Sequence, residues 1–292
     1  MRSLLFVPAD SERKLAKCLE SGADALIVDL EDSVAAENKA TARAMAAEFI
    51  AARAGAPSPA LFVRVNDLST GLIDDDLAAV VAAGPRGIML PKSNGIDDVG
   101  RLAVKLRVCE GRAGIADGTT RIIPLVTETA IGVLNAGTYS IGEPRMDGLT
   151  WGAEDLSAAI GAQATRDDEG RLTDVFRLAR ATTILAASAA HVPAIDTVFP
   201  DFRDLEGFRR ACVEAERDGF SACMAIHPAQ IPIINEVFTP SSEAIAEAQA
   251  IVDAFAEAGN PGVVAIDGKM FDRPHLRRAE RLLARAKPLS EG

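Results

Sequence analysis

The sequence predicts an α/β protein built as a (β/α)8 TIM barrel with a C-terminal helical extension. Eight short apolar segments recur along the chain, Ala-rich helical stretches separate them, and a long segment follows the eighth. The 292 residues suffice for one barrel-sized domain. Hydrophobic residues make up 48% and charged residues 25% of the chain, which is typical of a globular protein and not of a disordered one.

The predicted strands are short runs rich in Val, Ile and Leu, and several are apolar throughout. A parallel strand that helices cover is buried on both faces, so it shows a continuous apolar pattern. In chain order the strands are residues 3–8, 25–30, 61–65, 87–91, 121–126, 148–151, 194–199 and 222–226. Helical patterns between them include residues 11–21, 38–53, 74–83 and 174–190. This alternation predicts eight βα units closed into a barrel.

The chain continues past the eighth strand further than one closing helix requires. We therefore predict a barrel over residues 1–238 and a C-terminal extension over residues 239–292 that acts as a lid. Within the extension the pattern predicts a helix over 241–259, a strand over 263–266, a turn at Gly268 and a helix over 274–286.

Composition excludes several classes of protein. The net charge of −11 and the isoelectric point near 4.9 disfavour a nucleic-acid binder. The four cysteines form no C-x-x-C pair and the three histidines form no paired motif, so we expect free thiols and no zinc site. Apolar runs are only strand-sized and the N-terminus has no signal-peptide pattern, which predicts a cytoplasmic protein without a membrane partner.

Charged side chains follow most of the predicted strands, at the end where barrel enzymes carry their active sites. They are Asp29, Glu31, Asp32, Arg64, Lys92, Glu128, Glu154, Asp155 and His227. Structural ion pairs would explain some of them, such as Asp29 or Glu154. Ion pairs do not account for so many carboxylates beside one arginine and one lysine, whereas a bound divalent cation would. Oxygen ligands favour Mg²⁺ over zinc as that cation.

Seven segments carry a resemblance to a known family. They are, in order, LLFVPA, VDLEDSVA, FVRVN, MLPK, VTETAIG, WGAEDL and CMAIHPAQI. Together they resemble the HpcH/HpaI aldolase and citrate lyase superfamily, and most closely its citrate lyase β-subunit-like branch with the malyl-CoA and citramalyl-CoA lyases. The likeness runs from Arg2 to about Ala286. It implies a Mg²⁺-dependent TIM-barrel lyase that forms a homotrimer or a dimer of trimers.

The resemblance also implies roles for individual residues. Glu128 and Asp155 would ligate the metal, and Arg64 would hold the carboxylate or carbonyl oxygen of the substrate. Asp272 lies in a segment, GKMFDRP, that resembles the G-x-M-x-D-x-P signature of acyl-CoA lyases. It would be the acid/base, reaching a neighbouring subunit's barrel, with a pKa that burial raises toward the working range.

Each of these four residues has a plainer alternative. Glu128 would suit a helix N-terminus as an acidic residue, and Asp155 and Asp272 would suit helix N-caps. Arg64 would suit a buried structural ion pair.

The coenzyme portion of an acyl-CoA substrate requires a local basic cluster on this acidic chain. Five cations on the first two helices provide one: Arg13, Lys14, Lys17, Lys39 and Arg43. The family uses comparable positions for coenzyme A. By the same resemblance Phe6 would lie near the acyl or pantetheine portion, and Ile226 and His227 would contact the thioester arm. Solvated surface cations, a core phenylalanine and a structural histidine are the plainer alternatives.

These residues predict a Mg²⁺-dependent carbon–carbon lyase. It would cleave a 3-hydroxyacyl-CoA thioester, such as malyl-CoA or citramalyl-CoA, to acetyl-CoA and a 2-oxo acid. Two alternatives stay open: a citrate lyase β chain that acts on an acyl-carrier-protein thioester, and a catalytically weak paralogue that binds acyl-CoA. No histidine precedes His191, which disfavours the free-acid aldolases of the superfamily, because these use a histidine base near the second strand.

Overall fold

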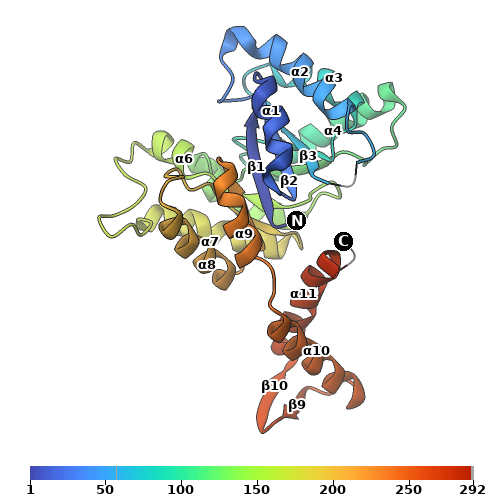
Figure 1. Ribbon diagram of the computed structural model, residues 1–292, viewed down its shortest axis with the longest axis vertical. Coiled ribbons are helices and arrows are strands. Elements are labelled where there is room, and N and C mark those ends of the chain that lie inside the picture. The colour runs from blue at the N-terminus through green and yellow to red at the C-terminus, as the bar shows by residue number, and fades with distance from the viewer. Residues whose placement is uncertain (57, 291–292) are drawn as a thin grey trace. The chain divides into compact units, whose positions relative to one another are not determined.

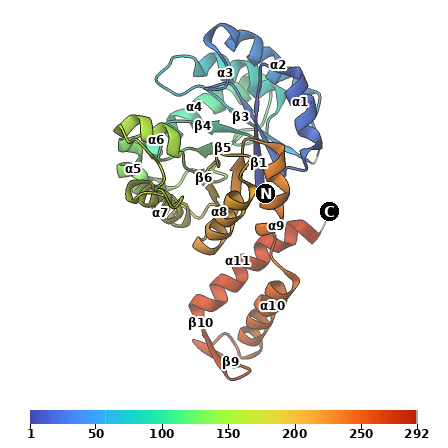
Figure 2. The same cartoon turned by 60° about the vertical axis from the view of Figure 1, so that its left-hand side comes forward.

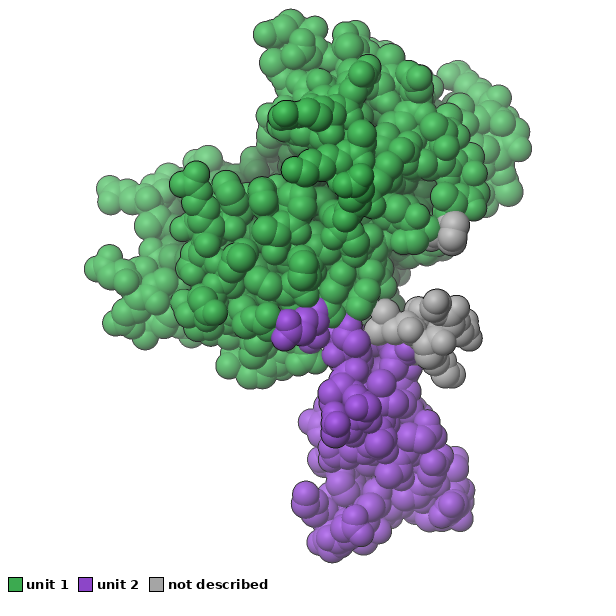
Figure 3. Space-filling model, viewed as in Figure 1, with its two compact units in different colours: residues 1–235 green, residues 236–292 purple. Residues whose placement is uncertain are grey.

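The computed structural model describes residues 1–56 and 58–290 and divides into two compact units, coloured separately in Figure 3. The boundary falls between Asn235 and Glu236, within helix α9 (Ile231–Val237). The sequence pattern places it after residue 238, at the end of the same helix.

In the described residues of the first unit, eight parallel strands form one sheet that nearly closes into a barrel (Figures 1 and 2). The strands are β1 (Ser3–Pro8), β2 (Ala25–Asp29), β3 (Ala60–Arg64), β4 (Gly87–Leu90), β5 (Arg121–Pro124), β6 (Leu149–Thr150), β7 (Ala194–Asp196) and β8 (Ala222–Ala225). Their order is β5-β4-β3-β2-β1-β8-β7-β6, and single bridges from Ile122 to Met146 and from Leu125 to Thr150 join the two edges. This confirms the predicted fold and all eight predicted strands.

Helices follow the strands and cover the outside of the sheet (Figure 2). They are α1 (Glu12–Cys18), α2 (Lys39–Ala51), α3 (Ile73–Val80), α4 (Ile96–Ala113), α5 (Ala130–Asn135), α6 (Ala153–Ile160), α7 (Asp174–Ala189), α8 (Leu205–Asp218) and α9. Short 3-10 turns lie at Leu19–Ser21, Ala36–Asn38, Val81–Ala83, Ala136–Ile141 and Pro228–Gln230. Helices of this kind pack an apolar face inward, and α4 is an example, because it buries Val99, Leu102 and Leu106 on one face at helical spacing.

The inside of the barrel is filled by apolar side chains from nearly every strand. They are Leu4, Ala25, Ile27, Phe62, Met89, Ile123, Leu125, Ile195, Ala222 and Met224. Close packing there requires a glycine at the start of β4. A Cβ at Gly87 would lie 2.6 Å from the carbonyl oxygen of Arg121 and 2.8 Å from the Phe62 ring. The filled interior leaves chemistry to the carboxyl ends of the strands.

A buried ion pair ties α4 to the loop before β6. Both Arg145 Nη atoms donate to the Glu110 carboxylate, at 2.9 and 2.7 Å, and the backbone nitrogens of Gly118 and Thr120 donate as well. The Glu110 side chain is completely buried. Burial opposes its ionisation, but the hydrogen bonds from Arg145 and Thr120 outweigh that effect and lower the pKa of Glu110 to about 2.

We expect Glu110→Gln to destabilise the protein by about 1.5–3 kcal/mol at pH 7, because it removes the buried carboxylate that both Nη atoms of Arg145 contact and leaves the exposed Asp117 as its acidic partner. Because the pKa of Glu110 is lower in the folded state, its contribution is present above about pH 4.5 and is lost as the pH falls toward 2. Urea unfolding at pH 7 and pH 3 measures both effects. Glu169→Gln, which breaks an exposed pair with Arg171, is the control. Equal losses in the two variants would contradict this account.

After the end of α9, the described residues of the second unit form two helices and a β-hairpin. Its elements are α10 (Ser242–Glu257), β9 (Val263–Ile266), β10 (Lys269–Asp272) and α11 (Arg273–Ser290). Both predicted helices and the predicted strand are present, and β10 is an element that the sequence pattern does not show. Asp267 and Gly268 have φ of 49° and 76°, the left-handed values of a two-residue hairpin turn. Ala248, Ile251, Phe255, Val264, Leu276 and Ala279 form the core of this unit.

Across residues 1–56 and 58–290, every helix is too short or too polar to cross a membrane.

Candidate active site

A cavity of about 350 Å³ opens at the carboxyl ends of the barrel strands. Five of the residues predicted to form the site line it: Phe6, Arg64, Glu128, Asp155 and Ile226. Apolar side chains complete the wall, namely Leu125, Trp151, Val198 and Met224. The volume lies in the range of small-molecule sites, roughly 300–1,000 Å³. The cavity therefore combines a few polar groups with a largely apolar wall.

Arg64 ends β3 and is held rigidly at the cavity wall. Strand pairing places it beside Asp29, and its Nε and Nη2 donate to the two Asp29 oxygens at 2.7 and 2.6 Å. Its Nη1 lies 3.1 Å from Glu31 Oε2, and its guanidinium lies 4.9 Å from the centre of the Phe6 ring. Burial opposes ionisation of Asp29, but the Arg64 contacts prevail and lower the pKa of Asp29. Arg64 thus presents a fixed charge to the cavity.

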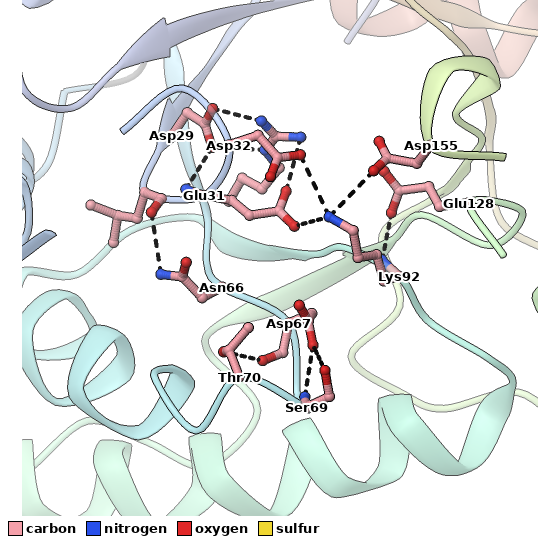
Figure 4. A network of polar contacts seen from close by, with 12 residues as sticks. Asp29, Glu31, Asp32, Asn66, Asp67, Ser69, Thr70, Lys92, Glu128 and Asp155 are labelled. Carbon is pink, nitrogen blue, oxygen red and sulfur yellow. Dashed lines mark hydrogen bonds and ion pairs between the residues drawn. The ribbon is translucent and has the colours of Figure 1, made fainter. Parts of the chain in front are cut away.

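Lys92, directly after β4, connects carboxylates from three loops (Figure 4). Its Nζ lies 2.5 Å from Glu31 Oε1 and 3.4 Å from Asp155 Oδ1. Its backbone nitrogen donates to Glu128 Oε2 at 2.5 Å. The backbone of Lys92 has φ 51°, a left-handed conformation that is costly for a residue with a side chain. In this uncommon conformation the backbone nitrogen of Lys92 donates the hydrogen bond that orients the Glu128 carboxyl group.

Carboxyl groups outnumber cations in the site. Two cations, Arg64 and Lys92, face five carboxylates, those of Asp29, Glu31, Asp32, Glu128 and Asp155. Burial, together with the charges of Asp155 and Glu31, raises the pKa of Glu128 to about 8. The buried Oε2 of Glu31 lies beside Arg64 Nη1 as an ion pair but accepts no hydrogen bond from the described residues. A further cation at Glu128 and Asp155 would relieve this repulsion.

The donor set of the cavity fits Mg²⁺. Carboxylates line it, and histidine and cysteine are absent from the described residues of its lining. No three metal-ligating side chains converge anywhere in residues 1–56 and 58–290, which excludes a closed all-protein cage there. Mg²⁺ needs none, because it binds through one or two carboxylates and keeps positions for water and substrate. Space near Glu128 depends on Gly152, where a Cβ would lie 3.0 Å from Glu128 Cγ.

The five predicted coenzyme-binding cations have different surroundings. Arg13, Lys14 and Lys17 are exposed on α1. Lys39 Nζ instead donates to the carbonyls of Leu30 and Glu31 and to Asn66 Oδ1, at 2.6–2.8 Å. Arg43 pairs with the buried Asp76 at 2.6 Å and with Asp75 at 3.4 Å. Lys39 and Arg43 therefore have partners within the barrel, and no pattern in the sequence predicts these bonds.

Ile226 and His227 follow β8. The backbone nitrogens of both donate to Gln230 Oε1, at 3.0 and 3.1 Å. His227 Nδ1 accepts from the Ala229 nitrogen, and its ring stacks on Phe202 at 4.7 Å between centroids. The histidine thus caps the turn after β8, the structural role that was its plainer alternative. Of these two residues, only Ile226 lines the cavity.

Asp272 ends β10 in the second unit and is about half exposed. Its Oδ1 lies 2.5 Å from His275 Nδ1 and accepts from the His275 backbone nitrogen at 3.4 Å. The hydrogen bond with His275 lowers the pKa of Asp272, so the raised pKa expected for a closed site is absent here. Asp272 therefore occupies the N-cap position of α11, which is the plainer alternative for this residue.

Two features of the site are not predictable from the sequence pattern. They are the apolar residues of the cavity wall and the contacts by which Lys92 connects three loops. Trp151 and Met224 lie at strand ends, where an apolar pattern predicts core packing and not a ligand-facing surface. The sequence predicts for Lys92 only a charge after a strand, because contacts between distant loops leave no local pattern.

Comparison with known proteins gives a consistent picture. The sequence profile described as HpcH/HpaI aldolase/citrate lyase matches residues 2–228. The mitochondrial citramalyl-CoA lyase of Rattus norvegicus is 33% identical, over 99% of this chain and 87% of its own length. A (3S)-malyl-CoA thioesterase of Cereibacter sphaeroides is 34% identical, over 99% of this chain and 95% of its own.

A solved structure is similar over nearly its whole length. The crystal structure of protein CitE from Mycobacterium tuberculosis, in complex with magnesium, acetoacetate and coenzyme A, superimposes with a TM-score of 0.77. It is 34% identical and covers 98% of both chains.

Proposed function

Because the chain belongs to the HpcH/HpaI aldolase/citrate lyase family and is a lyase, we propose that it cleaves a 3-hydroxyacyl-CoA thioester with Mg²⁺ as cofactor. The products are acetyl-CoA and a 2-oxo acid. The observation that carries this proposal is the buried Glu128 in a carboxylate-rich rim beside the fixed Arg64. The magnesium, the oxo acid and the coenzyme in the similar CitE crystal support the same assignment.

In cleavage the substrate hydroxyl loses its proton and becomes a carbonyl, while the C2–C3 bond breaks; the proton added later at C2 balances this loss, so the reaction releases no net proton. The bond electrons pass to the thioester enolate, which takes up a proton at C2 and becomes acetyl-CoA. Glu128 and Asp155 would hold Mg²⁺, which when bound supplies positive charge for the oxygens of the 2-oxo acid. Arg64, fixed by Asp29, binds the same end of the substrate through N–H groups that do not bond Asp29.

The remaining roles fall to the apolar wall and to Asp272. Trp151, Leu125 and Met224 exclude water from the reacting end of the cavity. Asp272 is the acid/base in the proposal and exchanges the proton at C2. We propose that the second unit is the lid that brings Asp272 to a neighbouring barrel in a homotrimer or a dimer of trimers.

We expect the phosphates of coenzyme A to bind the exposed α1 cations Arg13, Lys14 and Lys17. Replacing all three with Gln should weaken coenzyme A binding by roughly tenfold, and the difference should shrink at high salt. Calorimetry with coenzyme A and with pyruvate checks this, because pyruvate affinity should not change. The control removes three charges from α4, at Arg101, Lys105 and Arg107. An equal loss in that control would contradict the site.

The experiment that tests the carrier and the acyl group is a panel of thioesters. Malyl-CoA, citramalyl-CoA, citryl-CoA and a citryl acyl-carrier protein are assayed with Mg²⁺ for release of a free 2-oxo acid. Turnover of a coenzyme A thioester supports the proposal. Turnover of only the carrier-protein thioester would support a citrate lyase β chain, and turnover of none would support a binding paralogue.

A further inference from the structure

A second cavity, of about 380 Å³, lies in the first unit beside the candidate active site. The two cavities share Trp151, Thr197 and Val198 as a common wall. Residues of the segment after α6, of α7 and α8, of β7 and the loop after it, and of β8 form the rest of the lining. Five arginines line the second cavity, Arg166, Arg171, Arg177, Arg180 and Arg217, against three acids, Asp196, Glu214 and Asp218. Four of these arginines form ion pairs with carboxylates, some of which lie outside the cavity lining, and in the part of the chain that the structure describes Arg166 is the exception.

Arg166 is the cation that the protein itself leaves without an acidic partner. Within residues 1–56 and 58–290, its guanidinium donates to the Gly170 carbonyl at 2.7 Å and forms no ion pair. It is half-buried and lies 5.4 Å from the centre of the Phe199 ring. Burial lowers the pKa of Arg166 more than the charges of Asp196 and Glu214 raise it. A half-buried charge in this position is costly unless a ligand pairs with it.

A small hairpin holds Arg166 at the cavity. Arg166 and Leu172 form an antiparallel bridge, and the Thr173 nitrogen donates to the Thr165 carbonyl at 3.0 Å. Arg171 pairs with Asp167 on the same hairpin. The backbone around Arg166 is thus fixed by bonds within the segment. The guanidinium is positioned in advance, which reduces the entropy lost when a ligand binds.

A chain of polar contacts leads from this cavity to the active site. Arg180 Nη2 lies 3.3 Å from Asp196 Oδ2, and Asp196 Oδ1 accepts a hydrogen bond from Trp151 Nε1 at 2.6 Å. Trp151 is completely buried and lines both cavities. Arg180 Nη1 also lies 2.7 Å from Asp218 Oδ2. An anion that bound Arg180 would compete with both acids, and Asp196 is the group that fixes the indole of Trp151.

We propose that this cavity is a second ligand site for a small oxyanion with at least two negative charges, bound by Arg166 and Arg180. Guanidinium groups bind such oxygens in pairs, so a multiply charged ion is held better than chloride. Inorganic phosphate and a di- or tricarboxylate share this chemistry. Occupancy alters the surroundings of Trp151 and so the wall of the active site. The site does not depend on the proposed reaction, because its residues are separate from Arg64, Glu128 and Asp155.

The test uses Trp151, the single tryptophan of the chain. The metal-free protein is titrated with sodium phosphate and, separately, with sodium citrate, against sodium chloride at equal ionic strength. We expect a saturable change in tryptophan fluorescence with one or both anions and none with chloride. The anion that saturates at the lower concentration identifies the better ligand. Arg166→Gln should weaken binding by about tenfold or more, because it removes a charged hydrogen-bond partner.

Two further variants control this experiment. Arg101→Gln removes an exposed charge on α4 and should bind like the wild type. Leu172→Glu adds a carboxylate to the cavity wall and should prevent binding even if Arg166→Gln folds poorly. Calorimetry provides a readout independent of Trp151. Absence of saturable binding of either anion to the wild type, or unchanged affinity in both cavity variants, would overturn the proposal.

Discussion

Glu128→Gln and Asp155→Asn should each abolish measurable Mg²⁺ binding and lower turnover by about 10²- to 10³-fold, with the fold intact. Each removes one of the two carboxyl groups that would ligate the metal, and at Glu128 the metal would displace the carboxyl proton. The fold should survive Glu128→Gln in particular. A buried carboxyl with a pKa of about 8 is mostly protonated at pH 7, and the neutral amide resembles that form. Calorimetry with Mg²⁺, turnover at saturating Mg²⁺ and thermal unfolding measure the three effects.

The matched control is Glu154→Gln, which removes the carboxylate next to Asp155 on α6. Glu154 lines the same cavity but is exposed, so its loss should leave Mg²⁺ affinity within a few-fold of the wild type. EDTA should stop the wild-type reaction, and Mg²⁺ or Mn²⁺ should restore it. Undiminished turnover of Glu128→Gln and Asp155→Asn in chelated buffer would refute the metal site.

Asp272→Asn should bind Mg²⁺ and coenzyme A normally but lose about 10²- to 10⁴-fold in turnover, because it removes the proposed acid/base. The substitution separates this role from helix capping, since Asn caps a helix about as well as Asp. In the structure described here Asp272 is ionised beside His275. Proton donation therefore requires that closure over a substrate raise its pKa. Asp267→Asn, on the hairpin turn of the same unit, should retain full turnover.

Mixed oligomers test whether Asp272 acts across subunits. Glu128→Gln and Asp272→Asn are both inactive alone, but an exchanged oligomer can pair an intact metal site with an intact Asp272. Partial recovery of turnover in verified mixtures is the expected result. Full turnover of Asp272→Asn itself would leave the residue with only its capping role.

Much of the fold was predictable because burial leaves a local pattern. The eight strands carry continuous apolar runs, and the helices carry apolar residues at helical spacing, as α4 does. Strand β10 was missed because its residues are exposed or only half-buried, so no apolar run marks it. It forms by pairing with β9 across the turn at Asp267 and Gly268.

The site was predictable where a strand end fixes a side chain, and less so where loops meet. Phe6 and Arg64 lie on strands and Glu128 follows one closely, so topology alone brings them together. Asn66 and Asp76, which bind Lys39 and Arg43, lie distant from them in sequence, as the four carboxylates near Lys92 lie distant from Lys92. No spacing rule encodes such contacts. The arginine-lined cavity has the same origin, because its cations come from three separate segments: the segment after α6, α7 and α8.

Product analysis tests the central claim most directly. The wild-type protein is incubated with Mg²⁺ and with the thioester it turns over best, and both products are quantified. The account predicts a free 2-oxo acid and acetyl-CoA in equal amounts, and neither in the presence of EDTA. Release of free coenzyme A together with the intact hydroxy acid would show hydrolysis of the thioester, the activity named for the Cereibacter relative, and would contradict carbon–carbon cleavage.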